Sequence, residues 1–277
     1  MPHIEANGVR IWYELSGSGD HVMQVPGAVS AHEGYAQVTP EMSKHFTVLD
    51  YDPRGYGSSD RSEQRYNFDV WADDMVGLLD ALGIERTHVH GGSMGSMVAI
   101  RFAARFPERV NRLVVSGSAV KSDFMARLHY SVWKALARAY GTGSRELAQE
   151  LCTKAVSRGF LDGPNGGEPL VEAVMGVAGR NVGVGVFCDA CDTMIETDLT
   201  ADLAAVWAPT LVMVGDQDVL TPAEQGPSGG GARFIYENLV NAAERSYVVI
   251  EGAGHANLLD SPEASNRAVI EFLLGSR

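Results

Sequence analysis

Residues 88–96, with the sequence HVHGGSMGS, constrain the fold of this chain more than any other segment. They place Ser93 in the pattern Gly-x-Ser-x-Gly, between a β-branched segment and a helix-like one. This pattern is typical of a serine on a sharp, strained turn from a strand into a helix, where the glycines leave room for the backbone. We expect Met94 to begin the helix, so that its N–H can face a negatively charged oxygen near the positive end of the helix dipole. Ser93 is therefore a candidate nucleophile.

The segments on both sides of Ser93 support this interpretation. Arg86–His90 is short and follows a glycine break, which predicts a buried strand. Met97–Phe106 contains neither Gly nor Pro and is followed by Pro107, which predicts a helix that stops there. The β-branched run Val110–Ser116 predicts the next strand. The order strand, turn, helix, strand indicates a βαβ unit in a parallel sheet.

A nucleophilic serine needs a base and an acid that orients the base. The predicted strand Thr210–Gly215 leads into a loop with two carboxylates, Asp216 and Asp218, and the predicted strand Ser246–Ile250 leads into a loop with His255. Either aspartate could orient His255 while the other caps the following turn. The chain order Ser, Asp, His, each after a strand, is that of α/β-hydrolases and differs from the orders in chymotrypsin and subtilisin.

The chain resembles the α/β-hydrolase superfamily over nearly all of its length. The landmarks beyond Ser93 are Leu49–Ser59 (D-x-R-G-x-G-x-S loop), Phe106–Val110 (P-E-R-V helix end), Ala208–Thr210 and Gly215–Asp218 with Pro222 (acid loop), and Gly252–His255 with Ser261–Glu263 (histidine loop). By this resemblance Asp218 is the triad acid, and the catalytic residues are Ser93, Asp218 and His255. It also implies a mostly parallel, doubly wound sheet with an inserted helical cap.

The loop after the early strand Val22–Val25 departs from the family pattern, which begins with His-Gly and here begins with Pro26-Gly27. In the family this turn shapes a backbone N–H that stabilises the oxyanion, so the chemistry tolerates a changed side chain if Gly27 keeps the turn. We predict an oxyanion hole from the N–H groups of Ala28 and Met94, with Val29 as the alternative to Ala28. His32, later in this loop, either contacts substrate in the cleft or lies in a surface loop.

Residues 121–203 lose the β-branched runs and predict helices at Ser122–Tyr140, Ser144–Phe160 and Pro169–Asp192. In the family an all-helical insert at this place is the cap, which roofs the cleft and excludes water. We therefore predict a hydrolase core over residues 1–120 and 204–277, with the cap over 121–203.

The part of the cap that covers the cleft should be apolar. Each apolar cap residue named below either contacts substrate there or packs inside the cap. The predicted substrate contacts are Val29, His32, Met125, Trp133 and Met194, with Tyr130, Val174, Met175 and Phe187 as further roof candidates. His88 and His90 alternate on the predicted strand, and we interpret both as core or sheet-face residues.

Composition limits the partners. The net charge of −13 argues against nucleic acid and anionic membranes, and no apolar run approaches the ~20 residues that span a bilayer. The first residues lack a basic segment followed by an apolar one, which argues against secretion. Three cysteines cannot all pair, which fits a reducing cytoplasm. Cys188-x-x-Cys191 has no second ligand pair, so we interpret it as helix packing and expect no metal.

The resemblance implies an acyl-enzyme on Ser93 and no cofactor. Ser93-Met94-Gly95 and the histidine loop are most similar to 3-oxoadipate enol-lactonase-like and cofactor-free haloperoxidase-like esterases. We therefore expect hydrolysis of a carboxylic ester or lactone of a small molecule. The sequence is compatible with a monomer or a homo-oligomer. The alternatives are a carbon–carbon hydrolase of the meta-cleavage type, which needs cationic groups near the cleft for a substrate carboxylate, and a small-molecule receptor that retains the triad.

Overall fold

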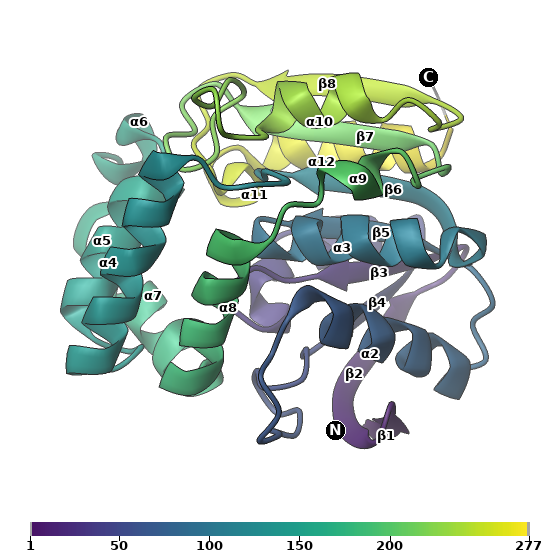
Figure 1. The fold of residues 1–277 in the computed structure, drawn as a ribbon, viewed down its shortest axis with the longest axis horizontal. Coiled ribbons are helices and arrows are strands. Elements are labelled where there is room, and N and C mark those ends of the chain that lie inside the picture. Colours follow the sequence, from purple (N-terminus) through teal and green to yellow (C-terminus); the bar gives the residue numbers. More distant parts are fainter. Residues whose placement is uncertain (1, 276–277) are drawn as a thin grey trace.

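An eight-stranded sheet runs through the middle of the molecule in the computed structural model, which describes residues 2–275 (Figure 1). The strands lie in the order β1-β2-β4-β3-β5-β6-β7-β8. At one edge β1 (His3–Ala6) and β2 (Val9–Gly17) run antiparallel to their neighbours. The remaining strands are mutually parallel: β3 (His21–Val25), β4 (Thr47–Tyr51), β5 (Thr87–Gly92), β6 (Val110–Ser116), β7 (Thr210–Gly215) and β8 (Arg245–Ile250).

The central strands are continuous apolar runs because helices cover both faces of the sheet. All residues of β7 are buried. One face carries α2 (Phe68–Ala81), α3 (Met94–Arg105) and α10 (Ala232–Asn238), whose apolar side chains join the main core. The other face carries η1 (His32–Tyr35), α1 (Thr39–Met42), α11 (Asn257–Asp260) and α12 (Pro262–Leu273), around a second core cluster. A short turn of 3₁₀ helix, η2 (Pro107–Arg109), connects α3 to β6.

The predicted strands Val110–Ser116 and Thr210–Gly215 are confirmed residue for residue. The strand before Ser93 ends later than predicted, since β5 continues to Gly92. The expected start of the helix at Met94 is confirmed, because α3 begins there. The turn between them is thus a single residue.

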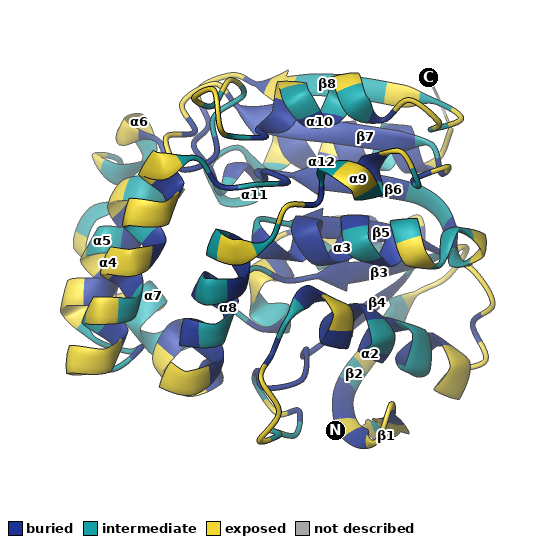
Figure 2. Ribbon diagram, viewed as in Figure 1, coloured by how far each residue is buried: buried dark blue, intermediate teal, exposed yellow. Residues whose placement is uncertain are grey.

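The helices between β6 and β7 gather beyond the carboxyl ends of the parallel strands (Figure 1). They are α4 (Phe124–Tyr140), α5 (Arg145–Ala155), α6 (Arg158–Leu161), α7 (Gly167–Asn181) and α8 (Val184–Glu196). The chain returns to the core through α9 (Thr200–Leu203), which packs against α3. In Figure 2 the outer side of α4 is exposed and its inner side is buried.

Two predicted helices of this insert are each divided in the structure. Ser144–Phe160 breaks at Val156, which is extended, and Ser157 then caps α6 by accepting a hydrogen bond from the N–H of Phe160. Pro169–Asp192 breaks at Val182, which is also extended and bridges to Tyr56 of the core. Both breaks occur where the chain contacts other elements, and an apolar pattern does not record such contacts. Within residues 2–275 no helix combines the length and apolarity needed to cross a membrane.

Candidate active site

Ser93 stands at the end of β5 in a conformation that few residues adopt. Its φ is 55° and its ψ is −124°, which places this non-glycine residue at positive φ. The glycines of the motif make the turn feasible. A Cβ on Gly91 would lie 2.6 Å from the carbonyl oxygen of Gly95, and a Cβ on Gly95 would collide with the carbonyl of Val25. Strain of this kind persists where the surrounding structure enforces it, as at active sites.

A chain of hydrogen bonds joins Ser93, His255 and Asp218. His255 Nε2 lies 2.8 Å from Ser93 Oγ, and His255 Nδ1 lies 3.1 Å from Asp218 Oδ2. Parallel strands bring the three residues together, because β5, β7 and β8 end at the same edge of the sheet. Asp218 and His255 are buried, with exposed fractions of 4% and 8%.

Asp218 is held by more than His255. Its Oδ1 accepts hydrogen bonds from the N–H groups of Leu220 and Thr221, and the Thr221 hydroxyl donates to Oδ2 at 2.9 Å. Burial alone would raise the pKa of Asp218, but the charge of His255 and the hydrogen bonds from His255 and Thr221 outweigh it and lower that pKa. The carboxylate therefore stays ionised beside the imidazole.

The sequence left Asp216 and Asp218 as alternatives, and the structure separates them. Asp216 is exposed and accepts a hydrogen bond from the N–H of Gly252 at 2.8 Å. It joins the acid loop to the histidine loop, whereas Asp218 touches the His255 ring. Sequence reasoning missed Thr221, whose Oγ1 lies 2.9 Å from His255 Nδ1. Its place three residues after an aspartate in a turning loop was the available signal.

The two predicted oxyanion donors come from segments that border Ser93. Met94 is the first residue of α3, where an N–H has no intrahelical acceptor. Gly27 packs against the serine, since a Cβ there would lie 3.2 Å from Ser93 Cβ. Ala28 follows directly and is buried, and its carbonyl accepts a hydrogen bond from the Tyr56 hydroxyl at 3.4 Å. Val29, the alternative, is partly buried against the main core.

A small cavity lies beside the serine. Its volume is about 10 Å³, enough for about one water molecule. The lining residues are all uncharged: Ser93, Met94, Met97, Gly117, Ser118, Ala119, Ser122, Tyr130, Met194 and Thr221. Tyr130 of α4 and Met194 of α8 form the part contributed by the inserted helices.

The other predicted substrate contacts lie elsewhere. Trp133 is buried on α4 and packs against Tyr130, with ring centroids 5.3 Å apart, but it does not line the cavity. Met125 is 57% exposed, so its predicted place in the roof is wrong. The buried face of α4 runs through Ala126, Tyr130 and Trp133, and Met125 lies outside it. Apolar character alone did not distinguish the two faces of this helix.

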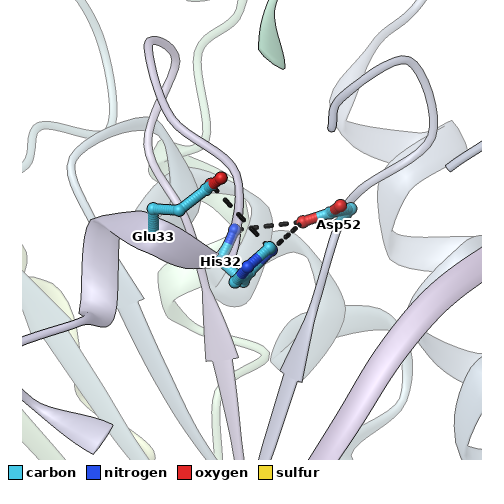
Figure 3. Close-up of side chains that lie close together, drawn as sticks. All are labelled: His32, Glu33 and Asp52. Atoms are coloured by element: carbon cyan, nitrogen blue, oxygen red, sulfur yellow. Dashed lines mark hydrogen bonds and ion pairs between the residues drawn. The ribbon is translucent and has the colours of Figure 1, made fainter. Parts of the chain in front are cut away.

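His32 is directed at Asp52, as Figure 3 shows, and is absent from the cavity lining. Its Nδ1 lies 2.6 Å from Asp52 Oδ1, and its backbone N–H donates to the same oxygen at 3.1 Å. The ring also stacks on Trp12 with centroids 4.0 Å apart. Burial opposes protonation, but the hydrogen bond and charge of Asp52, helped by Glu33, outweigh it and raise the pKa of His32. The prediction that His32 contacts substrate in this cavity does not fit this placement.

His32, Glu33 and Asp52 offer three ligand atoms within 4.8 Å of one another, a spacing that a metal ion could bridge (Figure 3). The oxygens of Asp52 are already engaged, however. Oδ1 accepts two hydrogen bonds from His32, and Oδ2 accepts one from the N–H of Ser58 at 2.7 Å. We therefore describe the cluster as a hydrogen-bonded ion pair.

The cysteines and strand histidines are buried. Cys152, Cys188 and Cys191 are free thiols, and burial raises the pKa of Cys152 to about 11. Cys188 and Cys191 both lie on the buried side of α8. His90 is fully buried, and burial lowers its pKa to about 3, so the ring is neutral. Its ring nitrogens have no hydrogen-bond partner among the described residues.

Comparison with known proteins gives the family. Residues 20–262 match the model of the alpha/beta hydrolase fold. The chain belongs to this family. The resemblance inferred from the motifs, and the fold class it implied, are confirmed.

Several relatives are hydrolases by name. The chain is 29% identical to 3-oxoadipate enol-lactonase 2 of Acinetobacter baylyi, over 84% of this chain and 80% of that protein. It is 42% identical to 2-hydroxymuconate semialdehyde hydrolase of a Pseudomonas species, but over only 42% of each protein. Among solved structures, the enol-lactonase of Burkholderia xenovorans LB400 superposes with a TM-score of 0.85 over 99% of this chain and 100% of that one. At 23% identity, that likeness concerns the fold.

Proposed function

We propose that this protein is a serine hydrolase that cleaves a carboxylic ester or lactone of a small molecule. The observation that carries this proposal is the hydrogen-bonded chain from Ser93 through His255 to Asp218, with the serine on a strained turn beside a cavity. The whole-length similarity to an enol-lactonase supports the same reaction class.

In the proposed mechanism His255 Nε2 takes the proton of Ser93 Oγ as this oxygen attacks the carbonyl carbon. Asp218 keeps the ring oriented and stabilises the imidazolium. The N–H groups of Met94 and Ala28 hold the oxyanion. His255 then protonates the leaving group, and water hydrolyses the acyl-enzyme by the same route. Every step uses protein groups and water, so the reaction requires neither a metal nor an organic cofactor.

Two observations place ester or lactone hydrolysis ahead of the carbon–carbon hydrolase alternative. A meta-cleavage product carries a carboxylate, for which we expected cationic side chains near the cleft. All of the lining residues of the small cavity beside Ser93 are uncharged. The similarity to the semialdehyde hydrolase covers less than half of either protein. We therefore place ester or lactone hydrolysis first.

The test combines covalent labelling with turnover. A fluorophosphonate should modify Ser93 in the folded protein, as mapped by peptide mass spectrometry, and pH-stat assays should detect acid release from short esters, γ-lactones or enol-lactones. Ser93→Ala should abolish both signals while leaving the thermal melting curve unchanged, because the substitution removes only the nucleophile. Labelling elsewhere refutes the nucleophile. Turnover only on a vinylogous diketone establishes the carbon–carbon hydrolase, and tight ligand binding without multiple turnover establishes the receptor.

We also propose a cytoplasmic protein whose partner is its small-molecule substrate. The three free, buried thiols suit a reducing compartment. The net charge of −13 disfavours binding to nucleic acid or to anionic membrane surfaces.

A further inference from the structure

The loop between β3 and α1 carries Ala28, the proposed second oxyanion donor, and contains little regular structure beyond the short turn η1. Its position therefore depends on individual contacts. Two of them come from the loop that follows β4: the Tyr56 hydroxyl donates to the carbonyl of Ala28, and Asp52 accepts from His32. The loop that carries Ala28 is thus held in place by contacts with the loop of residues 52–59.

The contact between His32 and Asp52 is the most elaborate of these. One carboxylate oxygen of Asp52 binds both the backbone N–H and Nδ1 of His32. The Asp52 side chain is fully buried, and the N–H of Ser58 fixes its other oxygen. Trp12 lies against the His32 ring and limits its rotation. A buried carboxylate that loses its partner is costly, so this arrangement favours one position of the loop.

The same loop is also joined to the inserted helices. Asn181, the last residue of α7, donates from its side chain to Glu33 Oε1 at 3.0 Å. Its carbonyl accepts the N–H of Gly57 at 2.8 Å. The segment around His32 therefore contacts Asp52 of the core on one side and Asn181 of the inserted helices on the other. Ala28 precedes His32 by four residues in the same loop.

We propose that His32 is a positioning residue for the oxyanion hole. By binding Asp52 through its backbone and its ring, it fixes the loop so that the N–H of Ala28 stays aimed at the oxyanion beside Ser93. The inference rests on the proposed function, because the oxyanion exists only if Ser93 attacks a carbonyl. This positioning role replaces the substrate contact that we predicted from the sequence for the His32 side chain.

The test compares His32→Ala with His32→Asn. Alanine removes the ring donor, whereas the asparagine amide nitrogen can occupy the place of Nδ1 and donate to Asp52. Loss of one oxyanion donor costs about 100- to 1000-fold in kcat, so a displaced donor should cost about 10- to 100-fold, with KM changed less than about threefold. His32→Asn should recover kcat to within about threefold of wild type. His21→Ala, a half-buried histidine at the opposite end of β3, is the control that should leave kcat unchanged.

A second measurement separates positioning from loss of stability. A boronic acid forms a tetrahedral adduct on a reactive serine and places an oxygen in the oxyanion hole, so His32→Ala should weaken its inhibition by the same factor as kcat, at a temperature where the variant is folded. A lower melting temperature with unchanged kcat and boronate affinity would overturn the inference, as would failure of His32→Asn to restore both. If the wild type is inactive on esters and lactones and forms no boronate adduct, the proposed function fails and the inference falls with it.

Discussion

Asp218 keeps its negative charge although it is buried, because three protein donors and the imidazole of His255 surround it. An exposed neighbour of the same type, Asp216, makes only a loop contact. The role of the orienting acid thus depends on which carboxylate is desolvated and aimed at the ring, and the two-residue spacing in the sequence left this open.

The two aspartates give a matched pair of variants. Asp218→Asn should lower kcat on a p-nitrophenyl ester by about 10⁴-fold, because the amide no longer stabilises the imidazolium or fixes its tautomer. Asp216→Asn should change kcat less than about threefold, since that side chain lies outside the hydrogen-bonded chain. Steady-state kinetics on both variants decide the assignment, and equal losses would contradict it.

Asp50 is also a buried carboxyl group, but its pKa is raised where that of Asp218 is lowered. Burial raises its pKa to about 6, against a smaller opposing effect from the hydrogen bond with Thr39. The single hydroxyl proton of Thr39 lies between two acceptors, Gln24 Oε1 and Asp50 Oδ2, each at 2.9 Å. If Thr39 donates to Gln24, only a protonated Asp50 can complete the second hydrogen bond. The geometry and the direction of the pKa agree.

This raised pKa makes stability depend on pH. The folded state binds the Asp50 proton more tightly than the unfolded chain, where the pKa is about 3.9, so its contribution falls as pH rises through about 4 to 6. The loss is of the order of 3 kcal/mol at most. Asp50→Asn should remove this loss, so the stability of the variant relative to wild type should rise between about pH 4 and pH 6 and stay constant above that in urea unfolding. A difference that does not change with pH would count against this account.

At the scale of elements, the sequence predicts what depends on local pattern. Strands β6 and β7 were predicted correctly because both are apolar runs between helices. The strained turn at Ser93 was predicted correctly because such a turn requires glycines at particular positions. The breaks at Val156 and Val182 were missed because each valine fits a helical apolar pattern. Their extended conformations accompany contacts with the rest of the molecule, such as the bridge from Val182 to Tyr56. The positions of His32 and Met125 depend on the same long-range packing.

Helix packing in the insert gives a prediction at this scale. Gly143, in the turn before α5, approaches Gly179 of α7 so closely that a Cβ would lie 2.8 Å from its Cα. Gly143→Ala should therefore force these segments apart and lower the free energy of unfolding by about 1–3 kcal/mol. The control is Gly159→Ala in α6, where no atom lies within 4 Å of the added Cβ. It should stabilise by about 0.5–1 kcal/mol through helix propensity. Similar effects of both substitutions in chemical denaturation would refute the close approach.

For the whole molecule, we propose that the carboxyl edge of the sheet carries the reacting groups and that the inserted helices restrict the access of substrate to them. The cavity at Ser93 holds about one water molecule, which is less than any acyl group requires. Substrate entry must therefore move side chains of the roof, among which Met194 is flexible and borders the cavity. The roof should thus set the preference for acyl-chain length, while the core sets the reaction.

Met194→Ala tests this division. Removing the side chain enlarges the space above Ser93, so kcat/KM should rise by about tenfold for longer acyl esters relative to acetate, since each buried methylene contributes about 0.8 kcal/mol. Met125→Ala is the matched control, because Met125 belongs to the same group of helices but is 57% exposed. A series of p-nitrophenyl esters of increasing chain length measures both profiles. If Met125→Ala shifts the chain-length preference as much as Met194→Ala, Met194 does not form the roof over Ser93. If neither substitution shifts the preference, residues of the core select the acyl length, and the cavity opens by moving a side chain other than Met194.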